Sequence, residues 1–77
     1  MDIKKVFGGN LRRIRLEKGL TQESLEAISG FDRSYIGGLE RGVRNPSLTA
    51  IAALADALGV SPVALLHGYT TVREGSQ

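Results

Sequence analysis

The sequence predicts an all-α domain of five short helices. Apolar residues recur at helical spacing in five successive segments, and four of these segments follow a Ser, Thr or Asp suited to cap a helix. Four of them end at a glycine. No alternating strand pattern or internal repeat competes with this interpretation. The 77 residues, 42% of them hydrophobic, suffice for one small core, so we expect a single folded domain.

The first three helices are closely spaced. The first is predicted over residues 3–18, where apolar side chains keep helical spacing. The second and third are about two turns each, with a hydroxyl or carboxyl side chain to cap the start and a glycine to end the helix. In chain order, the predicted stops and caps are Gly19, Thr21, Gly30, Asp32 and Gly42.

The last two helices come from the apolar half of the chain. The fourth follows the cap Ser47 and carries a broad apolar face. The fifth follows Ser61, and Pro62 suits its first turn. We expect the domain to cover residues 1–67, and the weakly periodic residues 68–77 to form a flexible tail.

Composition argues against an enzyme, a metal site and a membrane protein. The chain has no Cys, a single His, no phosphate-type glycine-rich loop and no paired carboxylates at acid–base spacing. We therefore expect no catalytic residues, no metal and no cofactor. No apolar run approaches the ~20 residues of a membrane span, and residues 1–10 lack the apolar region of a signal peptide, so the expected location is the cytoplasm.

The second and third predicted helices, joined by a tight turn at Gly30, fit a helix-turn-helix over about residues 21–42. In that motif the second helix lies in the major groove of DNA. Basic side chains crowd residues 4–15 and 33–44, and this local charge favours an anionic partner more than the net charge of +2 does. An ordinary helical hairpin within a bundle is the alternative.

Side chains at the starts of these two helices favour DNA. Arg33 can donate a bidentate pair to guanine and Ser34 can bond either base edge, so we expect both to read bases. An Arg at a helix N-terminus opposes the helix dipole, which favours a role outside the fold. The expected contacts to the DNA backbone are Thr21, Gln22, Tyr35, Arg41, Arg44 and Asn45. The alternatives are plain caps, core packing and solvated loop side chains.

Four stretches of the chain resemble the Cro and phage-repressor helix-turn-helix family, also called XRE-like. They are IRLEKGLTQESL, DRSYIGGLERG, RNPSL and LADALGVSPVALL, in the order and spacing of the family, and the match runs from about Asn10 to Leu66. The resemblance implies a five-helix, lambda-repressor-like DNA-binding domain. DRSY followed by ERGVRNPSL is most similar to the controller proteins of restriction-modification systems, which are homodimeric regulators that bind promoter DNA.

Residue by residue, the resemblance implies three kinds of role. Gln22 would contact the phosphate backbone, Arg33 and Ser34 would face bases, and Arg44 and Asn45 would lie beside the DNA backbone. A structural ion pair would brace the first helix against the third; its members are Arg15 and Glu40.

Two glycines interrupt the third helix, where each costs about 0.5–1 kcal/mol relative to Ala. Gly37 and Gly38 fall one turn beyond Arg33, so we predict that the missing side chains let the helix backbone approach DNA closely. The alternative is that another part of the protein packs there. At Gly38 many members of the resembled family carry a polar side chain that reads a base, and at Gly37 they often carry Ser.

The apolar half of the chain is the candidate dimer interface. A single small module reads too few bases for useful specificity, so we expect a homodimer on a twofold-symmetric operator. From Pro46 to Val72 the only formal charge is Asp56, which fits an isologous apolar contact. The candidate interface residues are Val60, Val63, Leu65, Leu66 and Tyr69, with an internal core as the alternative.

The expected partners are double-stranded DNA, a second copy of the chain and RNA polymerase. Together these describe a transcription regulator that binds a specific DNA sequence. The alternative function is an antitoxin-like or adaptor module, which would hold another protein on its apolar C-terminal face while DNA binding stays secondary.

Overall fold

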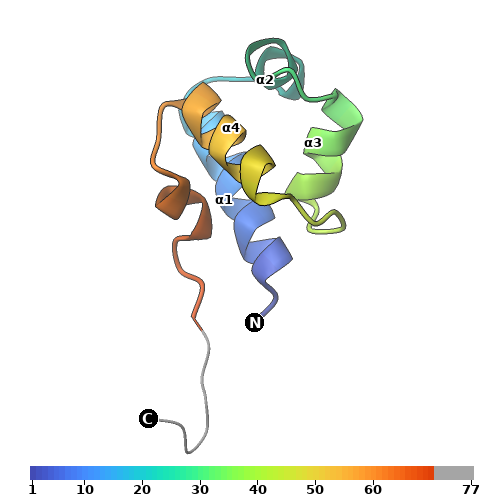
Figure 1. Cartoon of the computed structure of the whole chain (residues 1–77). Helices are drawn as coiled ribbons and strands as arrows, with labels where there is room; N and C mark the ends of the chain where they lie inside the picture. Colours follow the sequence, from blue (N-terminus) through green and yellow to red (C-terminus); the bar gives the residue numbers. More distant parts are fainter. Residues whose placement is uncertain (71–77) are drawn as a thin grey trace, which may run out of the picture.

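The structure, a computed structural model that describes residues 1–70, contains four α-helices and one 3-10 helix in that part of the chain (Figure 1). In chain order these are α1 (Ile3–Glu17), α2 (Gln22–Ser29), α3 (Arg33–Glu40), α4 (Leu48–Leu58) and η1 (Pro62–Leu66). The predicted all-α class is confirmed for the described residues. None of these helices has both the length and the apolar character needed to cross a membrane.

The structure has a helical element in each of the five predicted segments, but the count of five α-helices is not confirmed, because the last segment forms η1. Its backbone bonds span three residues: the Ala64 N–H donates to the Ser61 carbonyl at 2.9 Å, and the His67 N–H donates to the Ala64 carbonyl at 3.4 Å. A segment this short gains little from α-type bonds, so packing of the buried Leu65 against the core sets its shape. Of the predicted tail, residues 71–77 lie outside the described part of the chain.

A capping side chain starts every element, as the sequence predicts for four of the five. Each cap oxygen accepts a hydrogen bond from a backbone N–H two or three residues ahead, at 2.9–3.2 Å. The five caps are Asp2, Thr21, Asp32, Ser47 and Ser61. Asp2 is the one that the sequence interpretation missed.

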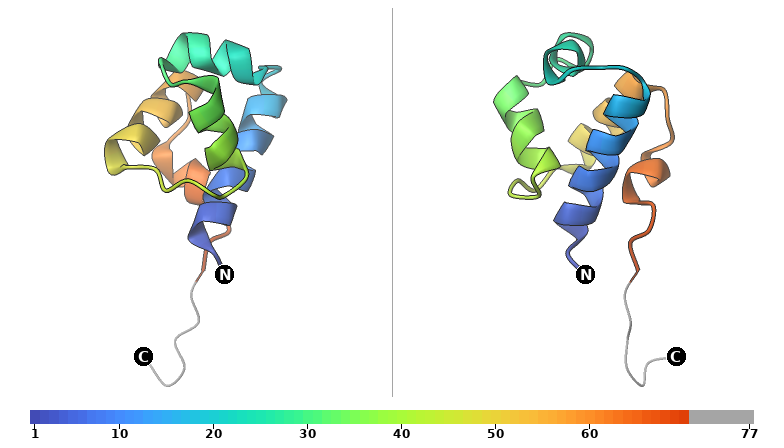
Figure 2. Two further views of the ribbon diagram at one scale, coloured as in Figure 1. Left: turned by 90° about the vertical axis from the view of Figure 1, so that its right-hand side faces the viewer. Right: turned by 180° about the vertical axis from the view of Figure 1, so that it is seen from behind.

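The long helix α1 lies between α3 and η1, as the opposite views in Figures 1 and 2 both show. α4 packs against η1 and α2, which closes the other side of the core. The core therefore draws on every element; its buried residues are Phe7, Leu11, Ile14, Leu25, Ile36, Leu39, Leu54, Ala55, Leu58 and Leu65. This packing leaves the start of α3 and the start of α2 on the outside.

A buried amide fastens η1 to α1. Asn10 is 9% exposed, and its Nδ2 donates to the Leu65 carbonyl at 3.0 Å and to the His67 carbonyl at 2.9 Å. These carbonyls end η1 and would otherwise lack a partner from the helix itself. Asn10 thus gives the C-terminal segment a fixed position on the domain, a role that the sequence interpretation missed.

Close contact between α1 and α3 requires a glycine at position 8. A Cβ at Gly8 would lie 2.1 Å from the Leu39 carbonyl oxygen and 2.7 Å from that of Glu40. Both are backbone atoms, so the two helices would have to separate to admit a methyl group. The neighbouring Gly9 has open space around the same position.

We predict that Gly8→Ala destabilises the domain by about 1–3 kcal/mol, because overpacking forces α1 away from α3. Gly9→Ala is the matched control, and it should stabilise α1 by about 0.5–1 kcal/mol through helix propensity. Urea unfolding followed by helical circular dichroism measures both changes. Equal effects of the two substitutions would contradict the tight α1–α3 contact.

Candidate nucleic-acid interface

α2 and α3 meet at a tight corner, visible at one end of the molecule in Figure 2. Gly30, with a φ of 80°, ends α2 and lets the chain turn. Across the corner, the Glu26 carboxylate accepts a hydrogen bond from the backbone N–H of Arg33 at 2.9 Å. The Ser29 hydroxyl accepts another from the N–H of Phe31 at 3.2 Å. Polar side chains therefore hold the bend between the two helices.

Arg33 lies exposed in the first turn of α3, and its Nη1 donates to Glu23 Oε2 of α2 at 2.6 Å. Glu23 therefore compensates the charge of Arg33 at the helix N-terminus, so the helix dipole alone does not favour a role for Arg33 outside the fold. Hydrogen bonds from its own backbone N–H and from Arg33 hold the pKa of the Glu23 carboxyl below its usual value. Glu23 engages only Nη1, so the Nε and Nη2 edge stays available for a bidentate contact.

Ser34 is exposed beside Arg33, and Asp32 fixes its hydroxyl. The Asp32 carboxylate accepts both the Ser34 backbone N–H, at 2.9 Å, and the Ser34 hydroxyl proton. These two bonds hold the pKa of the Asp32 carboxyl below its usual value. Because the hydroxyl proton is donated to Asp32, the Ser34 oxygen can take part in a further contact only as a hydrogen-bond acceptor.

The start of α2 carries a hydroxyl and an amide. Thr21 Oγ1 accepts the Ser24 backbone N–H at 3.0 Å as the cap of α2, and Thr21 is exposed. Gln22 is half-buried, and its Nε2 donates to Glu40 Oε1 at 3.1 Å. That single bond orients the amide while leaving its oxygen and one N–H for another contact.

Beneath this corner, Arg15 of α1 and Glu40 of α3 form a buried bidentate ion pair. Nε donates to Oε2 at 2.6 Å and Nη2 donates to Oε1 at 3.0 Å, with side chains 8% and 4% exposed. Arg15 Nη1 also donates to the Leu20 carbonyl at 2.8 Å. The hydrogen bonds to Glu40 raise the pKa of Arg15 above its usual value. The pair ties α1 and the turn after it to the corner.

The loop after α3 places a stacked cation next to the helix. The Arg44 guanidinium carbon lies 5.4 Å from the centre of the Tyr35 ring, a cation–π distance. The Tyr35 ring is itself 5.4 Å from the Phe31 ring, centre to centre. Phe31 and Tyr35 are half-buried and pack against the core, whereas Arg44 is exposed. Tyr35 is thus a core-edge residue and a platform for Arg44 at once.

Gly37 and Gly38 are both buried. A Cβ at Gly38 would lie 2.4 Å from Arg44 Cγ, and one at Gly37 would lie 3.2 Å from Arg41 Nη1. At Gly38 the stem of Arg44 therefore occupies the space that the sequence interpretation gave to DNA, whereas at Gly37 only the end of the exposed Arg41 side chain comes near. At Gly38 the structure favours the alternative, in which another part of the protein packs against the glycine, whereas close approach to DNA at Gly37 stays a prediction.

Contacts join most of the predicted DNA residues into one continuous area. Gln22 and Arg41 both approach Gly37, Arg44 lies over Gly38, and Arg33 sits at the head of the same helix. We call this area the α2–α3 surface; its members are Thr21, Gln22, Arg33, Ser34, Tyr35, Arg41 and Arg44. Asp32 was predicted only as a helix cap, and its bond to the Ser34 hydroxyl was not predicted. The role of Glu23 in orienting Arg33 was not predicted either, because it depends on a contact across the corner.

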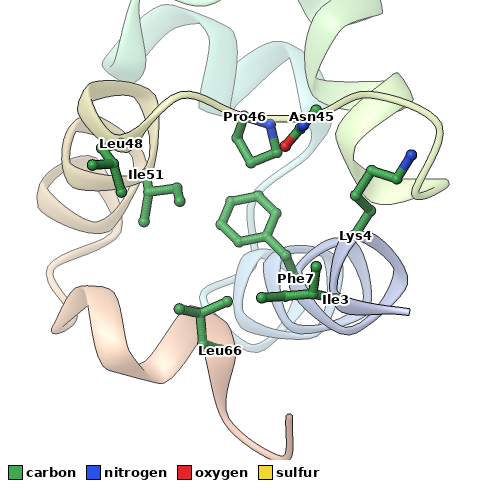
Figure 3. Close-up of a pocket in the computed structure, with 8 residues that line it drawn as sticks. All are labelled: Ile3, Lys4, Phe7, Asn45, Pro46, Leu48, Ile51 and Leu66. Carbon is green, nitrogen blue, oxygen red and sulfur yellow. The ribbon is translucent and has the colours of Figure 1, made fainter. Parts of the chain in front are cut away.

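The last predicted DNA residue, Asn45, directly follows Arg44 and is exposed, but it also borders a cavity. Figure 3 shows it with Pro46 on the rim of a cavity of about 190 Å³ above Phe7. The cavity is lined by Ile3, Lys4, Phe7, Asn45, Pro46, Leu48, Ile51 and Leu66. Most of these side chains are apolar, so Asn45 borders an apolar hollow between α1, α4 and η1.

The predicted dimer residues divide by exposure. Val63 is 74% exposed, and Val60, Leu66 and Tyr69 are half-buried. Leu65 is 0% exposed and belongs to the domain's own core, so we drop it from the candidate interface. Sequence reasoning missed two exposed apolar side chains beside the cavity, Ile3 at 44% and Leu48 at 85%.

This chain is similar to known proteins in both sequence and fold. A sequence model of the family HTH_3, described as helix-turn-helix, matches residues 11–65. The chain is 54% identical over 66 residues, 86% of each chain, to the uncharacterized HTH-type transcriptional regulator y4dJ of Sinorhizobium fredii.

Two solved structures extend the likeness. The restriction-modification controller protein C.AhdI from Aeromonas hydrophila superposes with a TM-score of 0.78 at 53% identity, over 80% of this chain and 94% of that one. The controller protein C.Esp1396I, solved as a tetramer in complex with its natural 35 base-pair operator, superposes with a TM-score of 0.77 at 37% identity, over 84% of this chain and 86% of that one.

Proposed function

This chain belongs to the helix-turn-helix family HTH_3, whose relatives include transcription regulators, and we propose that it binds a twofold-symmetric operator as a homodimer to regulate transcription. The observation that carries the proposal is the first turn of α3, where Arg33 is exposed and keeps a two-donor edge available. Within residues 1–70, no side chain or carbonyl bonds to that edge, and guanine offers the matching pair of acceptors in the major groove.

Arg33 and Ser34 would read neighbouring bases with opposite hydrogen-bonding character. The Nε and Nη2 edge of Arg33 donates, which suits N7 and O6 of guanine. The Ser34 oxygen accepts, because Asp32 holds its proton, and this suits the amino group of adenine or cytosine. The half-site would therefore combine a guanine with an adenine or cytosine next to it.

The rest of the α2–α3 surface would hold the DNA backbone. Thr21 and Gln22 lie at the N-terminus of α2, where backbone N–H groups and the helix dipole favour a phosphate. Arg41 and Arg44 add two exposed cations at and just after the C-terminal end of α3, and Asn45, the next residue, would contact the backbone beside them. Such contacts set affinity and register, whereas the first turn of α3 sets sequence preference.

Dimerisation would use the apolar side of α4 and η1. The exposed Val63 and Leu48, the partly exposed Ile3 and the open apolar cavity lie on elements remote from the start of α3. Half-buried Val60, Leu66 and Tyr69 would complete the contact. A twofold axis through this side would present two copies of α3 to successive half-sites. The operator-bound tetramer of C.Esp1396I supports self-association in this family.

We predict that Val63→Glu weakens the dimer about a hundredfold. In each copy, losing the buried Val63 side chain costs about 1.5 kcal/mol of association free energy. The twofold axis makes the total about 3 kcal/mol per dimer. Sedimentation equilibrium measures the monomer–dimer constant. Ile28→Glu is the matched control, since Ile28 is 53% exposed on α2, and it should leave the constant unchanged. An unchanged constant for Val63→Glu would remove η1 from the interface.

We propose that this chain is a controller protein of a restriction-modification system, with residues 1–67 as its DNA-binding domain. We further propose that it acts in the cytoplasm and that RNA polymerase is a further partner at the promoter. The likeness to C.AhdI and C.Esp1396I supports the controller type. Selection of bound duplexes from a randomised DNA pool, with the molar mass of the selected complexes, tests the proposal. We expect a twofold-symmetric sequence bound by an even number of chains. A pool without enrichment would contradict it and favour a module that binds another protein.

A further inference from the structure

The stem of Arg44 occupies the place of a missing side chain on α3. A Cβ built at Gly38 would lie 2.4 Å from Arg44 Cγ, 3.4 Å from Cδ and 3.6 Å from Cβ. Carbon atoms in contact prefer about 3.5–4.0 Å, so a methyl group and this stem cannot share the space. The clashing atoms belong to the inner half of the Arg44 side chain. Moving them away requires a rotation about a bond near the backbone, and that rotation also moves the guanidinium.

The backbone keeps Arg44 next to Gly38. The N–H of Val43 donates to the Gly38 carbonyl at 3.0 Å, and Gly42 has a φ of 76°. This is the bond pattern of a Schellman helix end, which returns the chain onto the last turn of its own helix. Because residue 43 is bonded to residue 38 itself, the loop cannot move away as a unit to relieve a clash at Gly38.

The far end of Arg44 has its own support. Its guanidinium stacks 5.4 Å from the centre of the Tyr35 ring, and Tyr35 packs on Phe31 at the edge of the core. Arg44 is thus held at both its stem and its head while remaining exposed. Fixing a long side chain on binding costs rotamer entropy, and a side chain that is already fixed in the free protein avoids this cost.

We propose that Gly38 is a positioning residue for Arg44. The space left by its missing side chain holds the stem of Arg44 and thereby directs the guanidinium toward a DNA phosphate. The inference rests on the proposed DNA binding and adds a mechanism to it. It also replaces the prediction that Gly38 approaches DNA itself. A glycine in mid-helix, unfavourable for helix stability, is explained by the cation that it orients.

The test compares four chains: wild type, Gly38→Ala, Arg44→Ala and the double variant. Dissociation constants are measured over a salt series on the duplex selected from the random pool. We expect Gly38→Ala to weaken binding about as much as Arg44→Ala. We also expect the fall of log K with log salt to become less steep by about one unit of slope per chain, because one phosphate contact is lost. We expect the double variant to match Arg44→Ala alone, because Gly38 acts only through Arg44.

Gly9→Ala is the control for the helical effect of the change. It also replaces a helical glycine by Ala, but no atom of residues 1–70 outside its own helix lies within 4 Å of the added methyl group, so both the affinity and the salt slope should stay unchanged. Wild-type affinity and slope in Gly38→Ala would overturn the inference. So would an equal loss from Gly38→Ala with and without Arg44, which would mean that Gly38 meets DNA directly. A wild-type chain that binds no duplex would overturn the proposed function and this inference with it.

Discussion

Replacing Glu40 by Ala is expected to destabilise the domain by about 3–5 kcal/mol, because it leaves the guanidinium of Arg15 buried without its partner. The Arg15 side chain is only 8% exposed, and two of its bonds, at 2.6 and 3.0 Å, end on Glu40. Gln22 would lose a partner as well, since its amide donates to the same carboxylate. Small domains hold only about 5–15 kcal/mol in total, so much of the stability depends on this pair.

The chain contains a matched control for this change. Arg13 and Glu17 form an ion pair on the surface of α1 at 3.2 Å, with side chains 48% and 61% exposed. Glu17→Ala should therefore cost at most about 0.5 kcal/mol. Urea unfolding of both variants gives the comparison. If Glu40→Ala cost no more than Glu17→Ala, the buried pair would not be what braces α1 against α3.

Replacing Arg33 by Ala should remove most of the sequence preference. A bidentate contact to guanine is worth about 1–3 kcal/mol, and a symmetric dimer makes it in both half-sites. The total loss of about 2–6 kcal/mol corresponds to a weakening of about thirtyfold to twenty-thousandfold on the selected duplex. Binding to a scrambled duplex should change far less. Fluorescence anisotropy on the two duplexes gives both constants.

Two further variants separate base reading from charge. Arg33→Lys keeps the positive charge but lacks the planar fork, so it should resemble Arg33→Ala on the selected duplex. Arg41→Ala removes a charge from the same surface and should weaken both duplexes alike. An equal loss for Arg33→Ala on both duplexes would make Arg33 a phosphate contact and would contradict its role in reading.

Local signals made most of the fold predictable from sequence. Thr21, Asp32, Ser47 and Ser61 cap helices because each side chain bonds a backbone N–H only two or three residues away. Gly30 and Gly59 end helices in the left-handed conformation that favours glycine. The character of the last helix was not predictable, since packing decides between α and 3-10 bonds in so short a segment.

The finer features of the site depend on residues far apart in the sequence. Glu23 compensates Arg33 from ten positions away, across the corner between two helices. The side chain that fills the space at Gly38 comes from a loop whose path follows the end of α3. Asn10 bonds carbonyls at residues 65 and 67. Composition and periodicity carry no information on such pairings, so the residue types were visible but their partners were not.

The central claim is that this chain recognises a particular DNA sequence. The most direct test is the ratio of two dissociation constants, one for the selected duplex and one for a scrambled duplex of the same length and composition, at about 0.15 M ionic strength. We predict a ratio of at least roughly a thousandfold, as is typical of specific DNA-binding proteins. A ratio near one, with the same steep salt dependence on both duplexes, would contradict the claim and leave only electrostatic binding to the DNA backbone.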